Sequence, residues 1–150
     1  MPSSGLNVDL AAIVKKLGSP ELRKVSTDLQ LDEHVRQGFP VGVIAALHQL
    51  GLTIDELAKL TATSPRTINR LLGSKKPTRL DLSVSERALR VATILAIGER
   101  LMGSLERLSA WMRVPNRYLG GAVPMHALET EFGRDHVLQS RYAIAYGGVG

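Results

Sequence analysis

Apolar residues recur every three or four positions along most of the chain, which is the spacing of amphipathic helices. No segment alternates polar and apolar residues over several positions, and aromatic residues make up only 4% of the 150 residues, so strand signals are weak. Gly, Pro, Ser and Thr interrupt the helical stretches at short intervals. The pattern predicts an all-α protein built from short helices.

The interruptions set the expected helix boundaries. A first helix is predicted over 6–17, and a weaker helical segment over 21–37 is expected to break near Thr27. Pro40 suits the first turn of the next helix. From there the predicted helices cover residues 41–50, 54–61, 65–72, 84–102 and 105–112, followed by a loop over 116–121, a short helix from Pro124 and a last helix over 133–146.

Capping residues support several of these starts. Thr53 followed by Glu56, and Ser83 followed by Glu86, have the spacing of a capping box, in which the two side chains bond to each other's backbone N–H. Ser64 precedes Pro65 as a predicted N-cap, and Ser104 is expected to cap the helix that ends near Trp111.

Two short helices joined by residues 62–64 have the pattern of a helix-turn-helix. Such a motif needs a small residue within its first helix, where Ala58 stands, and tolerates a small residue at the turn, where Ala62 takes the place that Gly often occupies. Apolar residues fall on the facing sides of both helices: Leu57, Ile68 and Leu71. The pattern therefore predicts a helix-turn-helix domain.

Charge adds a candidate function to this motif. The chain carries a net charge of +5, and the segment 59–79 holds six Lys or Arg residues with no acid between them. A local basic block favours contact with a polyanion. Arg pairs well with guanine, Asn with adenine, and hydroxyl groups at a helix N-terminus bind phosphate. The DNA-contact candidates are Ser64, Arg66, Thr67, Asn69, Arg70, Lys75 and Lys76, with Arg79 further along the same loop. The alternative is an ordinary helical hairpin with a solvated basic face.

The sequence gives little support for catalysis or metal binding. Cysteine is absent, which excludes disulfides, thiolate metal sites and cysteine nucleophiles, and the four histidines are scattered without metal-ligand spacing. No glycine-rich loop is followed by a helix that would bind phosphate. We therefore expect no enzyme activity, no metal and no cofactor. No apolar run approaches the roughly 20 residues that span a bilayer, and no secretory signal is visible, so we expect a cytoplasmic protein without membrane contact.

The C-terminal third carries a distinctive series of residues. It contains Trp111, Pro115-Asn116, Leu119-Gly120-Gly121, Pro124 with Leu128, Thr130-Glu131-x-Gly133 and Ile144-x-Tyr146-Gly147. This series resembles the Xre/MbcA/ParS antitoxin family, the antitoxins of RES-domain toxins, over roughly residues 39–147. The chain departs from the family at Ala143, where the family often has Arg, and after Gly147, where the family often has an aromatic residue.

The resemblance implies an Xre-like helix-turn-helix bundle followed by a small helical toxin-binding domain. The expected division is an N-terminal helical segment of unknown role (1–37), a DNA-binding domain (38–103) and a toxin-binding domain (104–150). The residues themselves suggest a buried Trp111, a turn with positive φ at Gly120-Gly121 and an N-cap at Thr130. The toxin-contact candidates lie on the last helix and tail: Arg134, Arg141, Tyr142, Tyr146 and Gly147.

What the resemblance implies about function is specific. The partner would be a RES-domain toxin that consumes NAD, and the antitoxin would inhibit it, form a homodimer and repress its own operon by binding operator DNA. Two alternatives remain open. One is a stand-alone helix-turn-helix transcriptional regulator without a toxin partner, and the other is a protein-interaction scaffold whose helix-turn-helix does not bind DNA.

Overall fold

The computed structural model describes residues 10–147, with side chains described as far as residue 140. Within this range the chain forms α-helices and short 3-10 helices and no β-strand, which confirms the all-α prediction. The helices are α1 (Leu10–Leu17), η1 (Pro20–Leu22), α2 (Asp28–Gln37), α3 (Gly42–Gln49), α4 (Ile54–Leu60), α5 (Pro65–Leu72), α6 (Leu82–Met102), α7 (Leu105–Met112), η2 (Arg117–Leu119), α8 (Pro124–Ala127) and α9 (Glu131–Gly147).

The chain divides into two compact units, residues 1–96 and residues 97–150, and the division falls within α6. We call them the N-terminal unit and the C-terminal unit. The domain boundaries expected at residues 37 and 103 remain predictions. Among the described helices even α6, the longest, lacks the sustained apolar stretch that crossing a bilayer requires.

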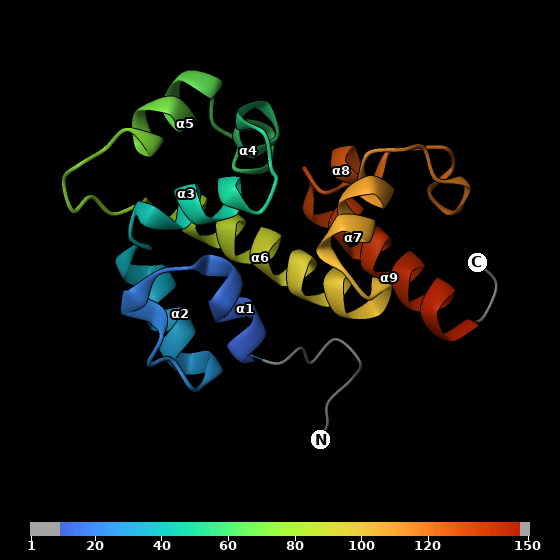
Figure 1. Ribbon diagram of the computed structural model, residues 1–150, viewed down its shortest axis with the longest axis horizontal. Helices are drawn as coiled ribbons and strands as arrows, with labels where there is room; N and C mark the ends of the chain where they lie inside the picture. Colours follow the sequence, from blue (N-terminus) through green and yellow to red (C-terminus); the bar gives the residue numbers. More distant parts are fainter. Residues whose placement is uncertain (1–9, 148–150) are drawn as a thin grey trace. The chain divides into compact units, whose positions relative to one another are not determined.

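Helix α3 forms the centre of the N-terminal unit. It packs against α1 on one side and against the α4–α5 pair on the other (Figure 1). Val43, Ile44 and Leu47 of α3 are fully buried, as is Leu17 at the end of α1. Because burying one aliphatic side chain of this size contributes about 1.5–3 kcal/mol, these contacts fix α1 and the helix-turn-helix onto the same core.

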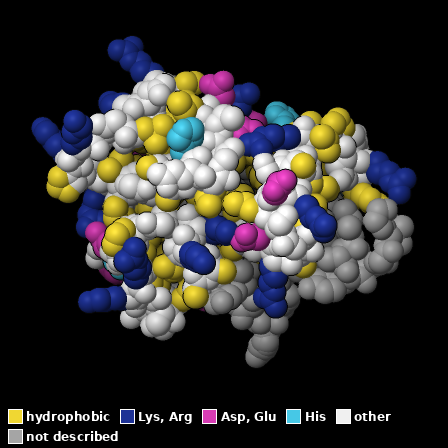
Figure 2. All heavy atoms as spheres, in the orientation of Figure 1, with side chains coloured by type: hydrophobic (Ala, Val, Ile, Leu, Met, Phe, Trp, Pro, Cys, Tyr) yellow, Lys and Arg dark blue, Asp and Glu magenta, His cyan; other side chains and the backbone are white. Residues whose placement is uncertain are grey.

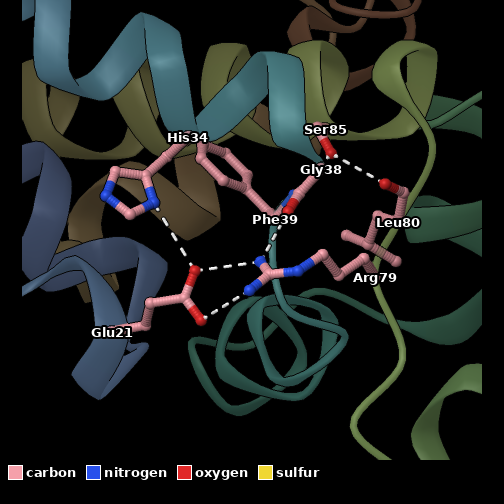
Figure 3. A network of polar contacts seen from close by, with 7 residues as sticks. All are labelled: Glu21, His34, Gly38, Phe39, Arg79, Leu80 and Ser85. Carbon is pink, nitrogen blue, oxygen red and sulfur yellow. Dashed lines mark hydrogen bonds and ion pairs between the residues drawn. The ribbon is translucent and has the colours of Figure 1, made fainter.

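The segment around Phe39 is hydrogen-bonded to the loop that follows α5. Pro40 and Arg79 form an isolated antiparallel β-bridge, and the Leu80 N–H donates to the Phe39 carbonyl at 2.8 Å. The Phe39 N–H donates to the buried Ser85 hydroxyl at 2.9 Å (Figure 3). Gly38 has φ +93°, and a Cβ there would overlap the Leu80 carbonyl oxygen, so only glycine fits this approach.

Most of the predicted caps are present. Thr53 and Glu56 form the expected capping box, Ser64 accepts from the Thr67 N–H, and Ser104 accepts from the Arg107 N–H. A capping box that starts at Thr27 explains why the segment 21–37 breaks at that residue.

The prediction of a capping box at Ser83 was wrong. Helix α6 begins at Leu82, and the Asp81 carboxylate accepts from the Val84 N–H at 2.8 Å. An acid two residues upstream therefore satisfies the first turn. Ser85 lies inside the helix instead, where its hydroxyl accepts from the Phe39 N–H.

The C-terminal unit has its own small core. Helix α8 packs against α7 and α9, and η2 packs against α9. Leu108, Met112 and Val137 are its most deeply buried side chains. Trp111, which was expected in the core, is only half-buried because its neighbour Met112 occupies the inner position of α7.

Candidate nucleic-acid interface and partner-binding domain

The turn between α4 and α5 has the geometry of a helix-turn-helix. Ala58 is buried where the two helices meet, and the Thr63 N–H donates to its carbonyl at 2.8 Å. Ala62 has φ +55°, a left-handed conformation that explains why such turns often contain glycine. The buried Thr61 hydroxyl donates to the Leu57 carbonyl at 2.6 Å, so the backbone of the turn is satisfied internally.

Helix α5 has one inner and one outer face. Ile68 and Leu71 are buried on the inner face. The exposed polar side chains are Arg66, Asn69 and Arg70, with Thr67 half-buried beside them. Arg and Asn are residue types that pair with base edges in the major groove. The structure thus brings the predicted contact residues of α5 together on one accessible side of the helix.

Two hydroxyls mark the start of α5. The Ser64 oxygen accepts from the Thr67 N–H at 3.1 Å, and the Ser64 O–H donates to the Thr67 oxygen at 3.1 Å. Ser64 is therefore occupied as an N-cap. Thr67 accepts that proton and retains its own O–H, which suits donation to a phosphate oxygen. The two residues that were predicted alike as phosphate contacts thus have different chemistry.

Within the described part of the chain, the exposed cations of this region are not neutralised by acidic side chains. Among the described side chains, no ion pair involves Arg66, Arg70, Lys75 or Lys76. Figure 2 shows Lys and Arg side chains projecting from the edge where Figure 1 places α5 and the loop that follows it. This edge therefore presents a positive potential that a polyanion would meet.

Arg79 behaves differently from the other residues of the basic block. Its guanidinium donates to both oxygens of the Glu21 carboxylate, at 2.9 and 3.1 Å, and to the Gly38 carbonyl at 3.0 Å (Figure 3). Arg79 as a contact of the DNA backbone stays a prediction, and in this structure its guanidinium is held by Glu21 and Gly38. Glu21 and Arg79 are 58 positions apart in the sequence, which explains why no local pattern could reveal the pair.

Electrostatics reinforce this contact. The hydrogen bonds from Arg79 lower the pKa of the Glu21 carboxyl below its usual value of 4.5, against a smaller opposing effect of desolvation. The same carboxylate raises the pKa of Arg79. The imidazole of His34 lies on the other side of the carboxylate, with Nδ1 at 3.5 Å from an oxygen of Glu21 (Figure 3). Glu21 thus connects η1, α2 and the loop after α5.

The Pro-Asn and Leu-Gly-Gly residues of the C-terminal unit form a closed loop. The Asn116 side-chain oxygen accepts from the Tyr118 N–H at 2.8 Å, and the Asn116 backbone N–H donates to the Ala122 carbonyl at 3.0 Å. Gly120 and Gly121 have φ of +66° and +88°, which confirms the predicted turn. These hydrogen bonds and turns fix the shape of the loop.

The Thr-Glu-x-Gly residues join α8 to α9. The Thr130 hydroxyl accepts from the Gly133 N–H at 3.0 Å, which confirms Thr130 as a cap. A Cβ at Gly133 would overlap the Ala127 carbonyl, so the glycine permits close contact between the end of α8 and the start of α9. The spacing of this motif is therefore a packing requirement.

The structure describes only some of the predicted toxin-contact residues. The Arg134 side chain is only 13% exposed and pairs with Glu131 at 3.4 Å, so most of it is covered. Gly147 is the last residue of α9. The side chains of Arg141, Tyr142 and Tyr146 lie outside the described residues.

The sequence reasoning missed Phe132. It lies in the first turn of α9, and 82% of the side chain is exposed. Its ring stacks on His136 with a centroid distance of 6.3 Å and an interplanar angle of 14°. One signal was available: Phe132 fills the unspecified position of the Thr-Glu-x-Gly motif, where packing requires no large residue.

Two family models match this architecture. Residues 30–92 match the Antitoxin Xre-like helix-turn-helix domain, and residues 98–147 match the Antitoxin Xre/MbcA/ParS C-terminal toxin-binding domain. A search of curated proteins found no matching relative. In the described part of the chain, no three His, Asp or Glu side chains are grouped to hold a metal ion. The helix-turn-helix geometry and the two consecutive matches show that the chain belongs to the Xre/MbcA/ParS antitoxin family.

Proposed function

We propose that this chain is the antitoxin of a type II toxin–antitoxin module. It binds and inhibits an NAD-consuming RES-domain toxin and represses its own operon by binding DNA. The observation that carries the proposal is a matched toxin-binding domain directly behind a helix-turn-helix whose exposed cations have no ion-pair partner among the described side chains. Antitoxins of this architecture are typically not enzymes. We expect the protein to act in the cytoplasm, as a homodimer and without a cofactor.

Repression would use the exposed face of α5. With this helix in the major groove, Arg66 and Arg70 would pair with guanine O6 and N7, and Asn69 with adenine N6 and N7. The Thr67 O–H would donate to a phosphate, while Lys75 and Lys76 would lie along the backbone beside it. Ser64 acts in this scheme by capping the helix and holding the Thr67 hydroxyl in place. A homodimer would present two such helices to a palindromic operator.

Inhibition would use the C-terminal unit. We propose that α9 and the tail approach the toxin and block access of the nicotinamide cofactor. Arg134, Arg141, Tyr142, Tyr146 and Gly147 are the proposed contacts. Tyrosines suit such an interface because a large ring with a polar tip contributes contact area at a small loss of rotamer entropy.

The deciding experiment is co-expression with the RES-domain protein encoded beside this gene, followed by affinity purification and measurement of cellular NAD. A stable complex that restores growth and NAD is expected. A chain lacking residues 146–150 should lose protection and keep operator binding. No complex and no protection would leave a helix-turn-helix regulator without a toxin partner.

A further inference from the structure

Phe132 is placed where the fold makes little use of it. Helix α9 turns Val137 into the core, and Gly133 meets the end of α8, so the packed side of the helix lies at those positions. Phe132 points away, with 82% of its side chain exposed. A phenylalanine left in water forgoes about 1.5–3 kcal/mol of burial. An exposed aromatic ring of this kind is typical of an interface anchor.

The ring has a stacking partner on its own helix. It stacks on His136, one helical turn further along α9, with nearly parallel planes. Stacking restricts the rotamers of Phe132, so less conformational entropy remains to be lost on binding. We call Phe132 and His136 together the aromatic platform.

Acidic side chains lie beside the platform. The Glu131 side chain, which pairs with Arg134, is 69% exposed, and Asp135 is exposed one turn further along. Because positions 131 and 135 of a helix share one face, the two acids lie on one side of the ring. The platform is therefore an apolar ring with a negative rim along one side.

The geometry points to the aromatic platform as the anchor that inserts into an apolar pocket with a basic rim on the toxin. This inference rests on the proposed function and names the surface that performs it. The platform lies inside the segment that matches the toxin-binding domain, residues 98–147.

The charge pattern disfavours other occupants. A negative rim repels nucleic acid and an anionic membrane surface. A second copy of this chain, docked through the same face, would bring the same acids against Glu131 and Asp135. A protein pocket with Lys or Arg at its edge complements both the ring and the rim.

The test measures affinity between the full chain and the purified RES-domain protein encoded beside this gene. Phe132→Ala should weaken binding by about 30-fold, the loss typical of an interface hot spot, while Phe132→Tyr keeps the ring and should stay close to the wild type. Leu29→Ala is the matched control, because Leu29 lies on α2 in the N-terminal unit and is exposed to 83%. This control should bind as the wild type does. Glu131→Lys should weaken binding to the toxin more at low salt than at high salt.

The outcomes separate the inference from the proposed function. If the wild type binds and Phe132→Ala binds equally well, the anchor is wrong and the proposed function stands. If the wild type does not bind at all, the proposed function fails and the inference fails with it. Equal losses of toxin affinity in Phe132→Ala and Leu29→Ala would also overturn the anchor. A changed oligomeric state in Phe132→Ala, with toxin affinity unchanged, would overturn it as well. Circular dichroism of each variant should match that of the wild type, since all three side chains are exposed.

Discussion

Helices α5 and α9 are built alike on the inside and differently on the outside. Each begins at a hydroxyl cap, Ser64 or Thr130, and each turns apolar side chains into its own core. The outer face of α5 carries Arg66 and Arg70 in an acid-free block, whereas the start of α9 carries Phe132 beside acids. The inner faces decide the fold, and the outer faces are the surfaces that we propose for two different partners.

The difference follows from the chemistry of those partners. A phosphate backbone is attracted at a distance by cations that remain hydrated, so its binding depends strongly on salt. A protein partner is held by apolar area that must be desolvated, and such binding depends less on salt. Operator binding and toxin binding should therefore separate both by residue and by ionic strength.

The largest expected effect comes from removing the cations of α5. Arg66→Ala with Arg70→Ala should reduce operator affinity about 100-fold or more, since each base pairing is worth about 1–3 kcal/mol. Fluorescence anisotropy with the upstream promoter across a salt series measures this loss, and toxin binding should be unchanged.

The control for this pair removes the same charge elsewhere in the N-terminal unit. Arg36→Ala with Arg90→Ala deletes two cations that are paired with Asp32 and Glu86. Its operator affinity should stay within a few-fold of the wild type. An equal loss in both double variants would show that net charge, rather than the face of α5, determines DNA binding.

Gly133→Ala should destabilise the C-terminal unit. The added methyl group would meet the Ala127 backbone, which cannot move aside as a flexible side chain does. Overpacking of this kind costs about 1–3 kcal/mol. Urea denaturation should show the loss, and toxin affinity should fall while operator binding persists. Gly42→Ala is the control, because nothing lies within 4 Å of a Cβ there; a loss of equal size in that variant would contradict the packing argument.

Ala62→Gly should stabilise the protein, in contrast to Gly133→Ala. Ala62 holds φ +55°, and a left-handed conformation costs a non-glycine residue about 1–2 kcal/mol. Glycine relieves this strain but adds disorder to the unfolded chain, so a net gain of up to about 1 kcal/mol is expected. Thermal unfolding measures it. The same substitution at Ala45, inside α3, should destabilise by about 1 kcal/mol, and a loss at both positions would mean that the turn is unstrained.

The sequence predicted what depends on local chemistry. The caps at Thr53, Ser64 and Ser104 need only a side chain and a backbone group a few residues away, and all three are present. The predicted cap at Ser83 is absent because a second capping residue, Asp81, lies two positions upstream. Its carboxylate accepts from the Val84 N–H.

Contacts between distant residues could not be predicted in this way. The bond between Phe39 and Ser85 joins positions 46 apart and exists only because the fold brings the segment before α3 against the start of α6. Helical spacing alone also could not show that Arg134 is covered and Phe132 exposed. Which side of α9 faces inward is decided by the contact of Gly133 with α8.

The smallest effect concerns Glu21, which precedes the matched residues 30–92. Arg79 holds the pKa of this carboxyl below its usual value of 4.5. A carboxyl whose pKa is lowered in the folded state contributes stability above the unfolded value, and this stability is lost as the pH falls through the folded pKa. The Glu21 side chain is 36% exposed, so solvent screens the pair and the effect is modest.

Glu21→Gln should therefore lower the free energy of unfolding slightly at pH 7 and reduce its fall below pH 4.5. Urea denaturation from pH 3 to pH 7 measures both, with Glu33→Gln on α2 as the control that should follow the wild type. The same variant sharpens the distinction among the cations. Because the Arg79 guanidinium also donates to the Gly38 carbonyl, it should stay bound to the fold in Glu21→Gln, and the salt dependence of operator binding should be unchanged. A steeper salt dependence would mean that Arg79, once released, joins Lys75 and Lys76 at the phosphates, and that Glu21 normally withholds it.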